Sequence, residues 1–279
     1  MDWRTVLAIN DCLSTLVLSK TAYVNNLRRF LSAPAEADNE LPRINTIRTY
    51  LRVLNRSGSS EATELFSRDE TFRRLQMGLA TEEQDQVNRQ LQTYLAIFRW
   101  RCPFDILHTW QFDGVNADLA VRARQTFCPG QTIKGLEGRL VEAPEEAVEQ
   151  QRQADMVSSI VESERFGQTF FMTSLARFVN HACDPNAKLV VRSRRYVDVV
   201  AIKEITLGEE VTVHYGSGYF GSDNQECLCR ICKAPSRSSR PVPCSHCGWE
   251  GEDVECSSAP CSFCVRHFSI YGNPWPATT

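Results

Sequence analysis

Several features that would assign this chain of 279 residues to a specialised class of protein are missing from it. Glycine (14) and proline (12) are too few for a collagen-like or low-complexity chain, and no segment repeats with the period of a solenoid. Asp2, Arg4 and Asp11 interrupt the apolar positions near the start, so neither a signal-peptide core nor a membrane span is expected. We therefore expect a soluble chain that is not secreted and has no membrane partner.

An excess of positive charge is missing as well. Thirty-one Lys and Arg residues against 34 Asp and Glu residues give a formal net charge of -3. Because no global cationic field is present to attract a phosphate backbone, sequence-specific nucleic-acid binding is not expected, and a basic partner is easier to accommodate than an acidic one. The composition, 42% apolar and 23% charged, is that of a globular protein with one or two cored domains.

Two different patterns follow one another along the chain. Apolar residues recur at helical spacing within 1–31, a second helix is expected over 44–54, and Thr81 with Gln84 has the capping-box pattern of a helix start. Beyond Pro103, short β-type runs are separated by turns. The runs are 119–123, 132–134, 188–192, 196–202 and 211–215, with short helices expected over 145–159 and 174–179. The fold class predicted from these patterns is α+β, with the helices concentrated at the N-terminal end.

The twelve cysteines are unevenly distributed, and eight of them fall between Cys227 and Cys264. In a reducing compartment, clustered cysteines are more often metal ligands than disulfides. Cys227, Cys229 and Cys232 supply three thiolates within six residues, which leaves one position of a zinc tetrahedron for a distant ligand. The isolated Cys183 is the best candidate for that position.

A second group has the pattern of a complete zinc ribbon. It is a pair of CxxC motifs with 13 intervening residues, formed by Cys244, Cys247, Cys261 and Cys264. Cys256 is then left over, and His246 and His267 are alternative ligands. Two structural zinc ions are expected, although disulfides or redox-active pairs remain alternatives for the ribbon.

The segment Gly216-Ser-Gly218-Tyr-Phe-Gly221 matches the GxGxxG pattern of dinucleotide-binding proteins. That fingerprint requires a helix to begin at its end and an acidic residue about 20 positions later. Here a cysteine cluster follows within six residues, so a dinucleotide site is rejected.

The most specific pattern lies in RFVNHACDPN (177–186) and GEEVTVHYG (208–216). These segments, their order, and the CxCxxC that follows them resemble the two signature motifs and the post-SET zinc site of the SET-domain protein-lysine methyltransferases. Cys102-Pro103-Phe104, residues 130–138 and the ending 261–276 are further similar to the fungal branch that methylates the lysine at position 20 of histone H4. One departure is Ala182, which stands where the family usually has an acidic residue.

The resemblance implies a domain organisation and an activity. The expected parts are a helical region (1–100), a SET domain (101–220), a post-SET zinc segment (221–236) and a C-terminal zinc ribbon (237–279). The implied activity is transfer of methyl groups from S-adenosylmethionine to a lysine of the histone H4 tail, with the nucleosome as partner and the nucleus and chromosome as location. Two alternatives stay open: a catalytically silent, zinc-dependent chromatin-binding module, and a methyltransferase that acts on a non-histone protein.

The same resemblance implies roles for cofactor-binding residues. Asn180 would hold the methionine end of S-adenosylmethionine, and His181 would contact its adenine through the backbone. Phe220 resembles the aromatic residue that lines the cofactor or lysine channel. Ala120 begins the segment that resembles the first cofactor-contacting strand.

The two residues expected near the target amine are Tyr215 and Ser159. Tyr215 would orient the amine, stabilise the methyl group in transfer and contact the cofactor. Ser159 is matched to a serine of this branch that occurs where other SET enzymes have a tyrosine, with Ser158 as the alternative. The smaller side chain would admit an amine that already carries methyl groups, so multiple methylation is expected.

Overall fold

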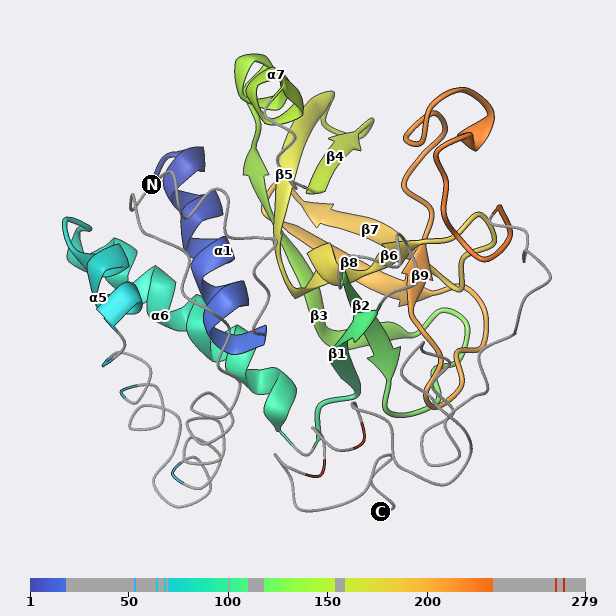
Figure 1. The fold of residues 1–279 in the computed structure, drawn as a ribbon, viewed down its shortest axis with the longest axis horizontal. Helices are drawn as coiled ribbons and strands as arrows, with labels where there is room; N and C mark the ends of the chain where they lie inside the picture. Colours follow the sequence, from blue (N-terminus) through green and yellow to red (C-terminus); the bar gives the residue numbers. More distant parts are fainter. Residues whose placement is uncertain are drawn as a thin grey trace. The chain divides into compact units, whose positions relative to one another are not determined.

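The computed structural model of this chain describes residues 1–18, 53, 64, 68, 70–99, 101–109, 118–153, 159–232, 264 and 268. Helices and strands are both present, which confirms the predicted α+β class (Figure 1). The chain divides into two compact units, each assembled from separate stretches of sequence. Unit 1 comprises Met1–Cys102, Glu137–Arg177 and Val191–Val197, and unit 2 comprises Pro103–Leu136, Phe178–Val190 and Asp198–Thr279.

Unit 1 contains the N-terminal helices, which are α1 (Trp3–Leu18), α5 (Glu70–Gln76), α6 (Thr81–Leu95) and the 3-10 turn η1 (Ala96–Phe98). α6 begins at Thr81, one residue earlier than the predicted capping box of Thr81 and Gln84 implies. The cap is Ala80, whose backbone N–H donates to the Glu83 carboxylate at 3.1 Å. The second helix expected over 44–54 lies outside the described residues, except for position 53. No helix in the described part of the chain is both long and apolar enough to cross a membrane.

The core of unit 1 joins α1 to the neighbouring helix α7 (Glu145–Gln153) and strand β5 (Gln168–Ser174). Leu7 of α1 packs with Ala147 and Val148 of α7 and with Phe171 of β5, all of them buried. The ring of Trp3 lies against Phe171 with a centroid distance of 5.6 Å. Apolar burial contributes about 25 cal/mol per Å², so this contact stabilises unit 1.

A five-stranded sheet has the order β4-β5-β3-β8-β7. β4 (Ser159–Ser163) pairs antiparallel with β5, and β5 pairs antiparallel with residues 138–142 of β3 (Thr132–Glu142). β3, β7 (Ala187–Ser193) and β8 (Tyr196–Ala201) each run through both units. The expected runs 188–192 and 196–202 correspond to β7 and β8, and 132–134 is only the beginning of the longer β3.

Unit 2 adds two short pairings that position the residues singled out in the sequence. β1 (Phe104–Thr109) and β2 (Asp118–Ala123) are antiparallel, whereas β6 (Asn180–His181) and β9 (Thr212–Val213) are parallel. β6 follows the 3-10 turn η2 (Leu175–Phe178), and a further 3-10 turn, η3, spans Ser222–Asn224. Val211 and Val213 are buried as the alternation predicted, but β9 is shorter than the predicted strand 211–215.

Candidate functional site

The two motif segments, 177–186 and 208–216, meet as neighbouring parallel strands in unit 2. Asn180 is the partner of Thr212 and His181 is the partner of Val213. Parallel strands cannot be joined by a tight turn, so the intervening residues must form a long connection. The predicted meeting of the segments around positions 180 and 215 is therefore present in the structure.

The side chain of Asn186 fastens the second segment beside the first. Its amide donates to Glu209 Oε1 at 2.9 Å and to the Glu210 carbonyl at 2.8 Å, and its Oδ1 accepts from the Thr212 backbone N–H at 2.9 Å. Each polar atom of this nearly buried amide is satisfied by the other segment.

Asn180 is buried and its amide nitrogen has two acceptors. Nδ2 donates to the Leu119 carbonyl at 2.9 Å and to Glu210 Oε1 at 3.0 Å. The carbonyl comes from β2, where the next residue is the buried Ala120. Because both amide protons are used, Oδ1 is the atom of Asn180 that can accept a hydrogen bond from a ligand.

Tyr215 is held at both ends by residues 179 and 181. Its hydroxyl donates to the Val179 carbonyl at 2.7 Å, and its backbone N–H donates to His181 Nδ1 at 3.2 Å. A phenol that donates its only proton to a carbonyl presents oxygen lone pairs to the rest of its surroundings. The Tyr215 oxygen can therefore accept a further hydrogen bond.

Tyr215 belongs to a cluster of five aromatic rings. Tyr215 and Phe220 are nearly parallel, at 15° and a centroid distance of 6.2 Å, and His181 lies 4.9 Å from Phe220. The ring centroid of Tyr219 lies 4.9 Å from that of Tyr215 and 4.8 Å from that of Phe220, and the Tyr219 side chain is half exposed. The rings of His214 and His181 are 5.0 Å apart. Burial raises the pKa of Tyr219. Burial together with the nearby His214 lowers the pKa of His181, which favours the neutral form of its ring.

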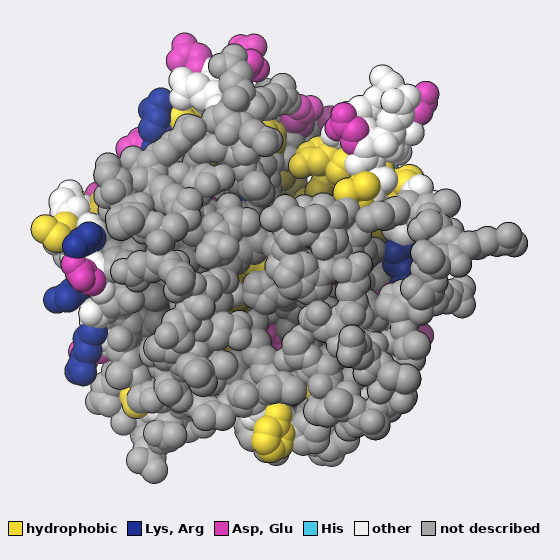
Figure 2. Space-filling view, in the orientation of Figure 1, with side chains coloured by type: hydrophobic (Ala, Val, Ile, Leu, Met, Phe, Trp, Pro, Cys, Tyr) yellow, Lys and Arg dark blue, Asp and Glu magenta, His cyan; other side chains and the backbone are white. Residues whose placement is uncertain are grey.

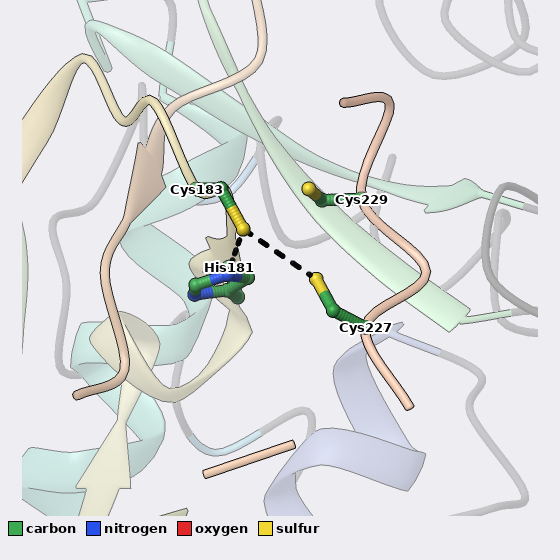
Figure 3. Close-up of side chains that lie close together, drawn as sticks. All are labelled: His181, Cys183, Cys227 and Cys229. Carbon is green, nitrogen blue, oxygen red and sulfur yellow. Dashed lines mark hydrogen bonds between the residues drawn. The ribbon is translucent and has the colours of Figure 1, made fainter. Parts of the chain in front are cut away.

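The first cysteine cluster forms as predicted (Figure 3). Cys183 Sγ lies 3.8 Å from Cys227 Sγ and 3.4 Å from Cys232 Sγ, and the ligand atoms of His181, Cys183, Cys227 and Cys229 lie within 4.8 Å of one another. Four thiolates at about 2.3 Å from a tetrahedral zinc ion are about 3.8 Å apart. The observed spacing therefore fits a zinc ion, with five donor groups available for four positions.

The thiol of Cys229 has a lowered pKa, so it ionises to the thiolate more readily than an ordinary cysteine. Burial by itself would raise the pKa of Cys229, but hydrogen bonds from the backbone of Cys183 and Cys232 outweigh it and lower that pKa to about 6. In contrast, the pKa of Cys183 is raised, mainly by its hydrogen bond with Cys232. Since metal binding requires deprotonated sulfur, this arrangement can take up zinc with release of protons.

The remaining predicted residues are not part of this cluster. Ser159 begins β4 in unit 1, opposite Met172, and is half-buried, whereas Ser158 lies outside the described residues. Of the predicted zinc ribbon, only Cys264 is described, and it is buried. The ribbon ligands outside the described residues are Cys244, Cys247 and Cys261.

Three contributing groups were not singled out from the sequence. The Asn186 amide and the Glu210 carboxylate belong to the two motif segments, so their polar side chains were a usable signal. The Val179 carbonyl is a backbone group and leaves no trace in the sequence.

The segment 214–232 also carries exposed hydrophobic and acidic side chains, together with the exposed basic residue Arg230. Tyr219, Leu228 and Ile231 are exposed hydrophobic residues, and Asp223 and Glu226 are exposed acidic residues. Figure 2 shows hydrophobic and acidic side chains together on this segment, which is orange in Figure 1. Such a mixed surface suits a partner with both apolar and basic groups.

The SET-domain family model matches residues 61–216, which is more than half of the chain. The chain therefore belongs to the SET-domain family.

Curated relatives carry the name histone-lysine N-methyltransferase SET9. The protein from Gibberella zeae is 36% identical over 184 residues, covering 65% of this chain and 26% of that protein. The protein from Aspergillus fumigatus is 40% identical over 154 residues, covering 54% of this chain and 24% of that protein. The chain thus spans about a quarter of the length of these relatives. A solved structure of a Chaetomium thermophilum Polycomb Repressive Complex 2 mutant is 18% identical, with a TM-score of 0.32 over 45% of this chain and 16% of that one.

Proposed function

We propose that this chain is a protein-lysine N-methyltransferase that transfers methyl groups from S-adenosylmethionine to the lysine at position 20 of histone H4, in nucleosomes of the nucleus. The observation that carries the proposal is the joint placement of Asn180, His181 and Tyr215 by the pairing of β6 with β9. The names of the curated relatives support a histone lysine as substrate. The similarity to the fungal lysine-20 branch supports the choice of histone and position.

S-adenosylmethionine, when bound, supplies a methyl group on a positively charged sulfonium. Asn180 Oδ1 would accept a hydrogen bond from its ammonium group, because both amide protons of Asn180 are already bound. Glu210 Oε1, which holds that amide at 3.0 Å, would add negative charge nearby. Ala120 and the ring of Phe220 would supply apolar walls.

The target lysine must lose a proton before it can react, since a free lysine has a pKa of about 10.4. Tyr215, Tyr219 and Phe220 would surround its side chain with rings, and this loss of water disfavours the ammonium form. The Tyr215 oxygen, whose proton is held by the Val179 carbonyl, can accept a hydrogen bond from the amine. Alignment of two reactants in this way is worth about 7 to 11 kcal/mol.

Three further assignments belong to this proposal. Ser159 would leave room for an amine that already carries methyl groups, which favours multiple methylation. The four thiolates of Cys183 and the segment 227–232 would hold one zinc ion and so fix the chain that follows Phe220. The ribbon cysteines would hold a second zinc ion.

Exposed acidic residues support a basic histone tail as the substrate. Asp223 and Glu226 are exposed on the segment that also presents Tyr219. A histone tail is rich in Lys and Arg, so acidic groups beside the proposed lysine channel would attract it and raise the association rate.

The experiment is mass spectrometry of recombinant nucleosomes after incubation with the 279-residue chain and S-adenosylmethionine. We expect successive additions of 14 Da to histone H4, which is the mass of one methylene group. Tyr215→Phe should reduce the rate at least about tenfold, which corresponds to 1.4 kcal/mol of transition-state stabilisation. Tyr196→Phe, which removes the same hydroxyl from β8, is the matched control and should leave the rate unchanged.

Equal modification by wild type and Tyr215→Phe would remove the catalytic assignment. Transfer to a protein of a cell extract, with none to histone H4, would replace the histone by another substrate. Absence of any cofactor binding in calorimetry would favour a silent binding module.

A further inference from the structure

The side chain of His181 connects two parts of the site that the proposed function treats separately. Its backbone belongs to β6, where it pairs with Val213. One ring nitrogen, Nδ1, lies 3.2 Å from the backbone nitrogen of Tyr215. The other, Nε2, lies 3.4 Å from Cys183 Sγ in the cysteine cluster (Figure 3). The side chain is buried, so water does not compete for either nitrogen.

The partners of His181 determine which nitrogen carries its proton. A neutral imidazole has one N–H donor and one lone pair. The Tyr215 backbone N–H is only a donor, so Nδ1 must accept from it and the ring proton must be on Nε2. That N–H then points at Cys183 Sγ, which accepts hydrogen bonds best as a thiolate.

The same reasoning selects the metal ligands among the five donor groups of the cluster. A nitrogen that carries a proton has no lone pair for a metal, so His181 is a neighbour of the metal and does not ligate it. Cys183, Cys227, Cys229 and Cys232 then fill the four positions. Four thiolates around Zn²⁺ leave two negative charges, and an N–H donated to one sulfur stabilises them.

We propose that His181 is a positioning residue that couples the zinc cluster to Tyr215. The cluster fixes the orientation of the imidazole through Cys183, and the imidazole fixes the backbone of Tyr215, whose hydroxyl is held separately by Val179. Zinc would therefore orient the reacting end of the site as well as stabilise the fold. This inference rests on the proposed function only where it concerns the reaction rate.

The first test uses wild-type protein and needs no substrate. Nitrogen-15 NMR of the histidine rings should show His181 protonated at Nε2 and unprotonated at Nδ1 at pH 7. After exchange of zinc for cadmium, the cadmium-113 signal of this site should be that of four sulfur ligands. A proton on Nδ1, or a signal of three sulfurs and one nitrogen, would overturn the proposal.

The second test uses His181→Asn, whose shorter side chain can still accept from Tyr215 but cannot reach Cys183. We expect zinc to dissociate about 10- to 100-fold more readily, as is typical when an outer partner of a metal ligand is lost. The backbone amide signal of Tyr215 should shift, kcat should fall about tenfold, and KM for S-adenosylmethionine should stay within about twofold, because the cofactor role of His181 is assigned to its backbone.

The variant results separate this inference from the proposed function. If wild type methylates no histone, the zinc dissociation and the Tyr215 signal still decide whether the coupling exists. An unchanged Tyr215 signal with unchanged zinc dissociation would refute it, even if kcat were reduced. A parallel rise of KM without a loss of kcat would assign the His181 side chain to cofactor binding instead.

Discussion

The buried ion pair between Asp11 and Arg177 gives a prediction whose magnitude follows from the structure. Asp11 lies on α1 and Arg177 in η2, with Oδ1 and Nη1 3.1 Å apart and both side chains 1% exposed. Asp11→Ala removes the carboxylate that lies 3.1 Å from the buried Arg177 guanidinium, and breaking a buried ion pair from one side typically costs about 3 to 5 kcal/mol. Asp11→Ala should therefore lower the free energy of unfolding by about this amount.

The assay is urea denaturation followed by circular dichroism at 222 nm, a standard helix signal. The exposed pair of Glu137 and Arg192, 3.3 Å apart with side chains 40% and 54% exposed, is the internal control. Glu137→Ala should cost less than about 1 kcal/mol, because water screens that pair. The double variant Asp11→Leu/Arg177→Met should lose less stability than the two single losses added together, since no charge is left buried.

A loss for Asp11→Ala as small as that for Glu137→Ala would refute this reasoning. It would mean that Arg177 finds another partner or water once the carboxylate is gone. Strict additivity of the Asp11 and Arg177 changes would refute it as well, because groups that pair directly must show coupling.

Three further predictions concern packing, pH and metal content. Gly138→Ala would bring a Cβ to 2.6 Å from Val197, so it should destabilise by about 1 to 3 kcal/mol in thermal unfolding, and an unchanged melting temperature would contradict the packing. Burial raises the pKa of Tyr94 from 10.0 to about 12, so folding favours its neutral phenol; the stability that it contributes is complete below pH 10 and is lost as pH rises through 12. Tyr94→Phe should remove that part of the alkaline loss in urea titrations, and identical pH profiles for both proteins would argue against it. Cys183→Ser should reduce bound zinc, measured by mass spectrometry of the metal, by one ion per chain, while two ions retained would show that Cys183 is not a ligand.

The helices could be foreseen because apolar spacing reports directly on burial. In α6, Val87, Leu91 and Tyr94 are buried on one face, as a period of 3.6 residues requires. The end of β9 could not be foreseen in the same way. Tyr215 continues the apolar alternation, but its N–H donates to the His181 side chain instead of a strand carbonyl, so the ladder stops at Val213.

The division into two units could not be predicted from the sequence either. Residues 137–177 share a compact unit with the N-terminal helices, while 178–190 belong to the other unit. Local propensity carries no information about which distant strands pair. The predicted boundary near residue 100 reflects the change from helical to β-type patterning and stays a prediction.

The site itself was foreseen to the extent that its chemistry resides in side chains. Asn180 and Tyr215 were singled out because their segments resemble the signature motifs of the SET-domain methyltransferases, and Cys183 because it is an isolated cysteine that could complete a zinc tetrahedron. The carbonyls of Leu119 and Val179, which orient Asn180 and Tyr215, were not, since every residue has a carbonyl. Their selection depends on strand register, which only the folded chain defines.

The adjacency of Asn180 and His181 has a geometric reason. Successive side chains of a strand point to opposite faces, so two neighbouring residues can serve two different structures at once. Asn180 reaches β2 through the Leu119 carbonyl, and His181 reaches Tyr215 and the cysteine cluster. A residue inserted between them would turn one side chain to the wrong face. The geometry of the strand therefore requires the two residues to be adjacent, in addition to the contacts that each side chain makes.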